Sequence, residues 1–284
     1  MITTLFKISL AIFIASNLLD LGLRLNPKEA WQGLKNYSFV GHTLFWGFVV
    51  GPALGYGITY VLPLEAPYAM GLHLLSMTPG APFLPMVMRK AHVDLGYTAA
   101  FMVLVSFTTV LLMPILVPWM LTGLAIQSWT IAKPLVLVML IPFLIGMGIL
   151  YFYSGFAIRI QPVVKKTTTL FAIIACSLCV LVYGEGLLGI DPGWALVSLI
   201  IFFFLITALP YWFGVGLQTD QRLVLSMGLS TRNLGATVAP LLVVAHIDQR
   251  AIIMVGLGLP CMLLFAWVSM KWFGRSTAVS TPTG

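Results

Sequence analysis

Apolar residues along this chain gather in nine long blocks that are separated by short polar stretches. A bilayer core of about 30 Å is crossed by roughly 20 helical residues, and each block is long enough to cross it. None of the blocks alternates apolar and polar residues as the strands of a membrane barrel do. The pattern therefore predicts an all-α polytopic membrane protein. The expected spans are 3–25, 38–62, 67–88, 95–119, 131–152, 167–189, 193–215, 220–245 and 249–273.

Composition and charge fit this interpretation. The chain is 60% hydrophobic and 8% charged, whereas a soluble domain is roughly 25% charged. Topology explains the net charge of +7 better than a nucleic-acid partner does, because the basic residues lie mostly on one side. Lys7, Lys133 and Arg250 fall on the side of the N-terminus. The opposite side carries Arg24, Lys28, Lys35, Arg89, Lys90, Arg159, Lys165, Lys166, Arg222, Lys271 and Arg275. The positive-inside rule predicts a multi-pass protein of the cell (inner) membrane, with its N-terminus outside and its C-terminus in the cytoplasm.

The first span has a second interpretation. Lys7 precedes the apolar stretch 8–19, as in a signal peptide. Asp20 and Arg24 stand where a cleavage site would be expected. This pattern favours a membrane helix.

The third span contains a run that an ordinary membrane helix avoids, Thr78-Pro79-Gly80-Ala81-Pro82, followed by Pro85. Proline removes a backbone donor and clashes with the preceding turn, and glycine adds backbone freedom, so the run predicts a break in the helix. Unwound backbone within a membrane requires burial in protein or a cavity. A simple proline kink is the alternative.

The eighth span contains a polar, glycine-rich window at residues 226–237, with Arg232 at its centre. A mid-span arginine costs roughly 2.5–3.5 kcal/mol on insertion scales, so it normally faces a partner or a water-filled cavity. The alternative, an extramembrane loop, would leave flanking helices too short to span. The window therefore predicts a second broken helix.

The two interruptions lie five spans apart, so the segments that carry them run in opposite directions. This spacing predicts an inverted repeat of four plus five spans, with the breaks at a shared binding site. The N-termini of half-helices attract anions. The expected substrate-binding residues are Thr78, Pro79, Gly80, Ala81, Pro82, Ser230, Thr231, Arg232, Asn233 and Gly235.

The stretch 78–121, the Gly22-Leu23 turn before Asn26-Pro27 and the window around Asn233 resemble the bile acid:sodium symporter family. Its shorter members have nine helices and lack the first family helix. The resemblance implies a secondary transporter of small organic anions that works by alternating access, with two crossed, broken helices. It also implies two parts within a single membrane domain, 1–284. These are a core of 38–119 and 193–273 and a panel of 3–25 and 131–189.

The chain departs from the family at the positions that bind sodium. By the resemblance, these positions fall at Gly47, Leu84, Pro85, Met102, Gly228 and Arg232, while Thr98 keeps a hydroxyl. Sodium needs several oxygen ligands, so we do not expect either sodium site to be retained.

Arg232 supplies a physical replacement for the lost sodium sites. Its guanidinium is permanently charged and suits a carboxylate. Our hypothesis is that it acts as a tethered cation for an anionic substrate, so that uptake is sodium-independent and Arg232→Ala abolishes it. The alternative is an internal pair with Asp20.

Coupling to protons is open, and the candidates are Asp20, His73 and His42, the other ionisable residues inside spans. A structural role is the alternative for each of them.

Other functions remain open. An arsenite or auxin-type carrier of related fold is the closest rival, and a membrane sensor that binds ligand without moving it is another. An intramembrane enzyme would have only Asp20, His73, Ser230 and Thr231 to work with. Nucleotide, metalloprotease and hydrolase motifs are missing, so we expect no enzyme, cofactor, metal or nucleic-acid partner. The expected partners are an organic anion and the lipid bilayer, while the substrate's identity and the oligomeric state stay open.

Overall fold

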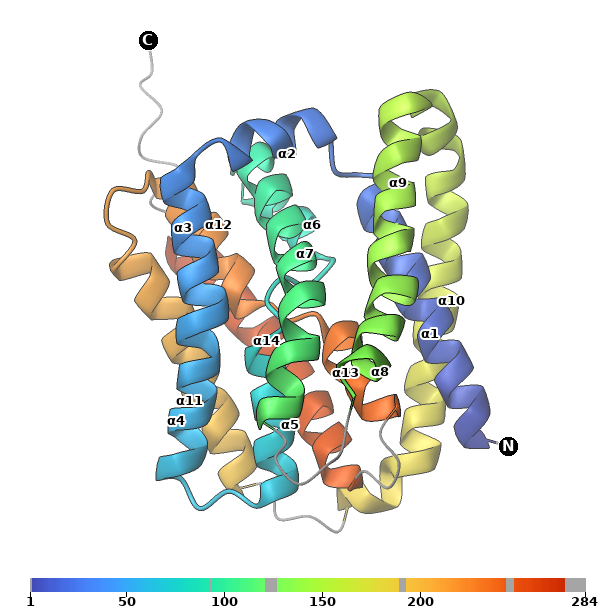
Figure 1. The fold of residues 1–284 in the computed structure, drawn as a ribbon, viewed down its shortest axis with the longest axis vertical. Helices are drawn as coiled ribbons and strands as arrows, with labels where there is room; N and C mark the ends of the chain where they lie inside the picture. Colours follow the sequence, from blue (N-terminus) through green and yellow to red (C-terminus); the bar gives the residue numbers. More distant parts are fainter. Residues whose placement is uncertain (1, 92, 121–126, 189–192, 244–247, 274–284) are drawn as a thin grey trace.

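The computed structural model describes residues 2–91, 93–120, 127–188, 193–243 and 248–273. Every regular element in these ranges is helical, and the helices form a bundle (Figure 1). The α-helices are α1 (Ile2–Gly22), α2 (Pro27–Leu34), α3 (Tyr37–Phe45), α4 (Gly51–Val61), α5 (Ala66–Ser76), α6 (Leu84–Lys90), α7 (Leu95–Met120), α8 (Ser128–Pro134), α9 (Ile141–Phe152), α10 (Ser154–Leu188), α11 (Gly193–Trp212), α12 (Thr219–Ser230), α13 (Leu234–Val243) and α14 (Gln249–Phe273).

The described residues include seven stretches of helix that are long and apolar enough to cross a membrane. The third and eighth predicted spans are instead pairs of shorter helices, α5 with α6 and α12 with α13. The prediction of an all-α, multi-pass membrane protein is confirmed. The seven stretches are Ile2–Gly22, Tyr37–Val61, Leu95–Pro118, Ser128–Phe152, Ser154–Val182, Gly193–Trp212 and Gln249–Trp272.

Two of these stretches contain a π-helical segment, Trp46–Val50 between α3 and α4 and Leu135–Leu140 between α8 and α9. A proline follows each segment closely, at Pro52 and Pro142. Proline prevents regular helical hydrogen bonding one turn earlier, which accounts for the widened turns. Both segments lie against the broken helices.

The helices gather in two groups. Helices α1, α9 and α10 stand together on the right of Figure 1, and α3, α4 and α11 lie on the left. The first group is held by a close approach of two glycines. A Cβ atom on Gly22 would lie 2.3 Å from the backbone oxygen of Phe143, and one on Gly146 would lie 2.5 Å from that of Leu19. Only glycine allows this approach of α1 to α9.

Several predicted boundaries need correction. Helix α10 begins at Ser154, although the prediction started the sixth span at 167. Arg159, Lys165 and Lys166 suggested a loop, but their long side chains are tolerated on a helix that extends beyond the apolar layer. The short helix α2 was not predicted; the Asn26 side chain caps it by accepting from the Lys28 amide. The predicted ends of the sixth and eighth spans, 189 and 245, lie outside the described residues.

Candidate functional site

The two interrupted spans meet at their breaks. Pro79 and Arg232 form an isolated antiparallel β-bridge. The Gly80 amide donates to the Thr231 carbonyl at 2.8 Å, and the Asn233 amide donates to the Thr78 carbonyl at 2.9 Å. We call residues 78–81 and 231–233 the crossing. Each segment satisfies backbone groups of the other that a helix would otherwise satisfy, as buried backbone requires.

Local sequence explains why the chain leaves the helix at both places. Helix α5 ends at Ser76, and α6 does not begin until Leu84. Pro79 cannot donate a backbone hydrogen bond, and Gly80 has φ +87°, which a side chain would disfavour. In the eighth span, α12 ends at Ser230 and α13 begins at Leu234. The predicted breaks are confirmed, and the alternative of a simple proline kink is wrong.

Side chains reinforce the crossing. The hydroxyl oxygens of Thr78 and Thr237 lie 2.7 Å apart, in hydrogen-bond contact. The Thr231 hydroxyl accepts from the Ala81 amide at 3.2 Å. Thr78, Thr231 and Thr237 are fully buried. These bonds lie in the interior of the bundle, where the window packs against the first broken helix.

Two other predicted residues, Pro82 and Ser230, take less part in the crossing. Ser230 is fully buried, but its hydroxyl donates to the Met227 carbonyl within its own helix at 2.9 Å. Pro82 is half-buried in the segment that leads to α6.

Asn233 and Gly235 face the predicted panel. The Asn233 side-chain oxygen accepts from the Ala236 amide at 3.2 Å and so caps α13. Its side-chain nitrogen lies 3.9 Å from the sulfur of Met139, in the second π-helical segment. At Gly235 a Cβ atom would lie 2.8 Å from Ile14 of α1. The start of α13 is therefore in direct contact with the predicted panel.

Arg232 points the other way, into the predicted core. Its side chain is fully buried, Nη1 donates to the Ser76 carbonyl at 3.2 Å, and its guanidinium carbon lies 4.9 Å from the centre of the Phe202 ring. Ser76 ends α5, and the C-terminal end of a helix carries partial negative charge. The Arg232 backbone amide contacts the sulfur of Met262 at 3.0 Å. The cation thus lies between α5 and α11, while α14 contacts the backbone of Arg232.

Arg232 is only partly satisfied. Nε and Nη2 are buried and have no hydrogen-bond partner among the described residues. Within the same residues, no ion pair to Arg232 is formed, so its charge meets a carbonyl dipole and an aromatic face but no carboxylate. A buried charge without a counter-ion is costly, which makes this the most unusual electrostatic feature of the described bundle.

The alternative prediction, that Arg232 pairs with Asp20, is wrong. Asp20 forms a salt bridge with Arg24, four residues later, and also accepts from the Arg24 Nε at 3.2 Å. It accepts from the side-chain nitrogen of Gln161, on α10, at 2.8 Å. Asp20 therefore joins α1 to α10, away from Arg232.

Most of the positions that the resemblance assigns to sodium hold no side-chain oxygen. A Cβ atom on Gly228 would lie 2.5 Å from the Phe101 ring, so that ring occupies the space of a longer side chain. Met102 and Leu84 are fully buried, and Thr98 donates its hydroxyl to the Asp94 carbonyl at 3.2 Å. Besides Arg232, the remaining positions are Gly47 and Pro85, whose side chains offer no oxygen. Gly47 packs near Leu229 and Pro79, and Pro85 lines a cavity described below.

Neither histidine candidate touches the crossing. His73 lies 2.9 Å from the Thr59 hydroxyl and stacks on Tyr56, which ties α5 to α4. His42 lies 2.8 Å from the Ser38 carbonyl in the preceding turn of its own helix. Both histidines have a local structural partner.

A sequence model of the sodium bile acid symporter family matches residues 11–190, which is more than half of the 284-residue chain. The chain belongs to this family. The resemblance noted in the sequence is thus confirmed, and the matched part includes the first broken helix. The family is one of transporters rather than enzymes, as we predicted.

A curated relative has the same character. The chain is 26% identical over 249 residues to a protein of Oryza sativa subsp. japonica named as a probable chloroplastic sodium/metabolite cotransporter, BASS2. The aligned region is 84% of this chain and 57% of the rice protein, so the chain spans little more than half of that relative.

Sequence reasoning missed three contributors to the site. Thr237 was within the polar window but was not singled out, although its spacing of four from Asn233 lets its hydroxyl donate to that carbonyl at 2.9 Å. Phe202 and Met139 come from apolar helices without any distinguishing local pattern. Only the folded arrangement identifies these last two.

Proposed function

We propose that this protein is a secondary transporter of small organic anions that works without sodium, with Arg232 as a fixed cation. The observation that carries the proposal is a buried arginine at the crossing that has no carboxylate partner among the described residues. In a family of sodium symporters, such a cation can replace the charge that the lost sodium sites supplied.

Arg232 acts in this proposal from behind the crossing rather than by direct contact. Its backbone belongs to the crossing, while its guanidinium lies between α5 and α11. At about 7 Å, roughly the reach of an arginine side chain, a unit charge attracts a carboxylate by about 2 kcal/mol at an effective dielectric constant of about 20. This energy corresponds to about 30-fold in affinity.

The anion would lie on the opposite side of the crossing, towards the panel. A cavity of about 210 Å³ lies there between α1, α8, the second π-helical segment and α13. Its lining is apolar and includes Ile14, Met139 and Gly235. An organic acid could place its apolar part in this cavity and its carboxylate near the N-terminus of α13, where the helix dipole favours negative charge.

Alternating access would follow from movement of the core (38–119 and 193–273) against the panel (3–25 and 131–189). We further propose nine membrane crossings, arranged as an inverted repeat of four plus five, in which α5 with α6 and α12 with α13 each cross as a broken pair. The excess of basic residues on one side supports an N-terminus outside and a C-terminus in the cytoplasm of a cell (inner) membrane. Asp20, His73 and His42 stay the candidates for coupling to protons.

The test is uptake of radiolabelled organic acids into proteoliposomes in sodium-containing and sodium-free buffer. We expect equal uptake in both, because most positions that the resemblance assigns to sodium hold no side-chain oxygen. Uptake that requires a sodium gradient would contradict the proposal. A ligand that binds but does not accumulate would indicate a membrane sensor instead.

Arg232 is tested in the same assay. Arg232→Met removes the charge, and we expect it to weaken substrate affinity by about 30-fold or abolish uptake. Arg232→Lys should retain part of the affinity. The control is Arg222→Met in the first half of the same broken span, because Arg222 lies on α12 and donates to the Leu217 carbonyl just before that helix, away from the crossing. Equal affinities of Arg232→Met and Arg222→Met would refute the role of Arg232.

A further inference from the structure

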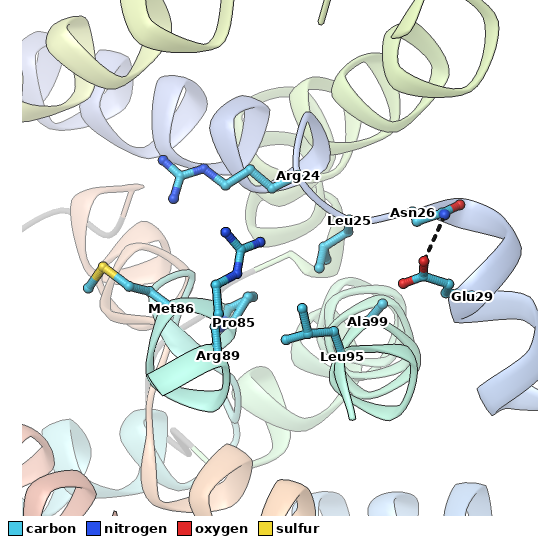
Figure 2. A pocket seen from close by; sticks show the side chains of 9 residues that line it. All are labelled: Arg24, Leu25, Asn26, Glu29, Pro85, Met86, Arg89, Leu95 and Ala99. Atoms are coloured by element: carbon cyan, nitrogen blue, oxygen red, sulfur yellow. Dashed lines mark hydrogen bonds between the residues drawn. The ribbon is translucent and has the colours of Figure 1, made fainter. Parts of the chain in front are cut away.

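Two adjoining cavities open at the end of the bundle where α1 passes into α2. One has a volume of about 270 Å³ and the other about 330 Å³, and both are lined by Arg24 and Arg89. Figure 2 shows the guanidinium groups of both arginines on the same side of the first cavity. Lys165 and Gln161 of α10 line the second cavity. We call the two cavities together the vestibule.

Of the two arginines that line the vestibule, one has a counter-ion and the other has none within the described part of the chain. Arg24 is neutralised by its salt bridge with Asp20. Glu29 is the acidic residue of the lining, and it accepts from the Asn26 side-chain nitrogen at 3.0 Å, on the far side of the first cavity from Arg89 (Figure 2). The Arg89 side chain has no hydrogen bond or ion pair among the described residues, and it lines the same cavity as the Arg24 guanidinium. An anion in the first cavity would therefore meet the uncompensated charge of Arg89 and could also accept from the Arg24 guanidinium.

The basic residues come from different parts of the molecule. Arg89 lies on α6, which continues from the first broken helix, whereas Arg24 follows α1 and Lys165 lies on α10. In the proposed division, Arg89 belongs to the core, and Arg24 and Lys165 belong to the panel. A ligand that bridges them depends on the relative position of the two parts, so it would favour one arrangement of core and panel over the other.

We propose that the vestibule is an access site for the carboxylate group of the transported anion, in which Arg89 is the residue that selects for negative charge. This inference rests on the proposed function and deepens it. A guanidinium binds a carboxylate through two parallel hydrogen bonds, which a neutral substrate cannot match. The site lies at the end of the bundle that the basic residues assign to the cytoplasm, so it loads or releases substrate on that side.

Binding is measured as the shift in melting temperature of the purified protein in phosphatidylcholine nanodiscs, with succinate as the probe and its uncharged diamide as the control ligand. A ligand that binds the native state raises the melting temperature by an amount that grows with the logarithm of its concentration over its dissociation constant. We expect succinate, but not the diamide, to stabilise the wild type. Arg89→Gln should weaken the apparent affinity about tenfold or more, and Arg89→Lys should weaken it less, because lysine keeps the charge but not the fork.

The matched control is Lys90→Gln. Lys90 is the exposed neighbour of Arg89 on α6 and does not line either cavity, so the same charge change there should leave succinate affinity within about twofold. Equal weakening by both variants would reduce the effect to general surface charge and overturn the proposal. A wild type that succinate does not stabilise would overturn it as well.

A lipid headgroup offers similar chemistry, so the measurement is repeated in nanodiscs that contain phosphatidylglycerol. If stabilisation that depends on Arg89 arises only from this lipid, the vestibule binds a headgroup and the proposal is wrong. The inference is separable from the proposed function. If succinate and its diamide bind equally while sodium-independent uptake is intact, only the role of the vestibule is refuted. If succinate binds at Arg89 but no uptake occurs, the proposed transport function is refuted.

Discussion

Gly80→Ala offers a direct test of the crossing, because it alters packing without changing charge. Gly80 has φ +87°, and a Cβ atom there would lie 2.7 Å from the Cγ2 atom of Val105. A left-handed conformation costs an alanine about 1–2 kcal/mol. Overpacking of a dense interior costs about 1–3 kcal/mol more. We therefore expect Gly80→Ala to lower the free energy of unfolding by about 2–5 kcal/mol.

Gly216→Ala separates the two contributions. Gly216 has φ +79°, but nothing lies within 4 Å of the position of its Cβ atom. This variant should lose only the backbone contribution of about 1–2 kcal/mol. The difference between the two alanine variants then measures the close contact at the crossing.

The assay is equilibrium unfolding in mixed micelles, together with proteoliposome uptake. Val105→Ala in the Gly80→Ala background should restore part of the lost free energy, because it removes the methyl group that the new Cβ meets. The packing argument is refuted if Gly80→Ala is no less stable than Gly216→Ala, or if Val105→Ala only adds to the loss.

Three further predictions concern Gly228 and Thr78 near the crossing and the pair of Asp248 and Arg250 at the start of α14. Gly228→Ala should lose about 1–3 kcal/mol in the unfolding assay, because its Cβ would lie 2.5 Å from the Phe101 ring, and Phe101→Leu should recover part of this loss. Thr78→Val should lose about 1 kcal/mol with its buried hydrogen bond, and an unchanged free energy would contradict that bond. The hydrogen bond from the Arg250 side chain lowers the pKa of Asp248, so the stability from this pair is present above about pH 4 and is lost as pH falls through the lowered pKa. A pH titration of unfolding should show this acid loss in the wild type and not in Asp248→Asn.

The breaks in the two helices were predictable from local chemistry. Proline and glycine around Gly80 exclude regular helix whatever the surroundings are, and an arginine in an apolar span must find an exceptional environment. The meeting of the two breaks was also expected, since unsatisfied backbone in a membrane needs a partner. The structure provides this partner in the bridge between Pro79 and Arg232.

The direction of Arg232 was not predictable. Its neighbours Phe202 and Ser76 come from other helices, and no local pattern indicates which face of the broken span turns to them. Asp20 was a reasonable partner by charge, but an i,i+4 arginine and a glutamine across the helix pair satisfy it first. The vestibule is a similar case, because Arg24 and Arg89 become neighbours only through the packing of distant segments.

The crossing is joined chiefly by main-chain groups, at Gly80 with Thr231 and at Asn233 with Thr78. Every residue type has a carbonyl, and all but proline have an amide, so this joint survives when the surrounding side chains are exchanged. In the proposed transporter, replacing the side chains around this joint would alter the charge at the site while leaving the main-chain connection between the two broken helices in place.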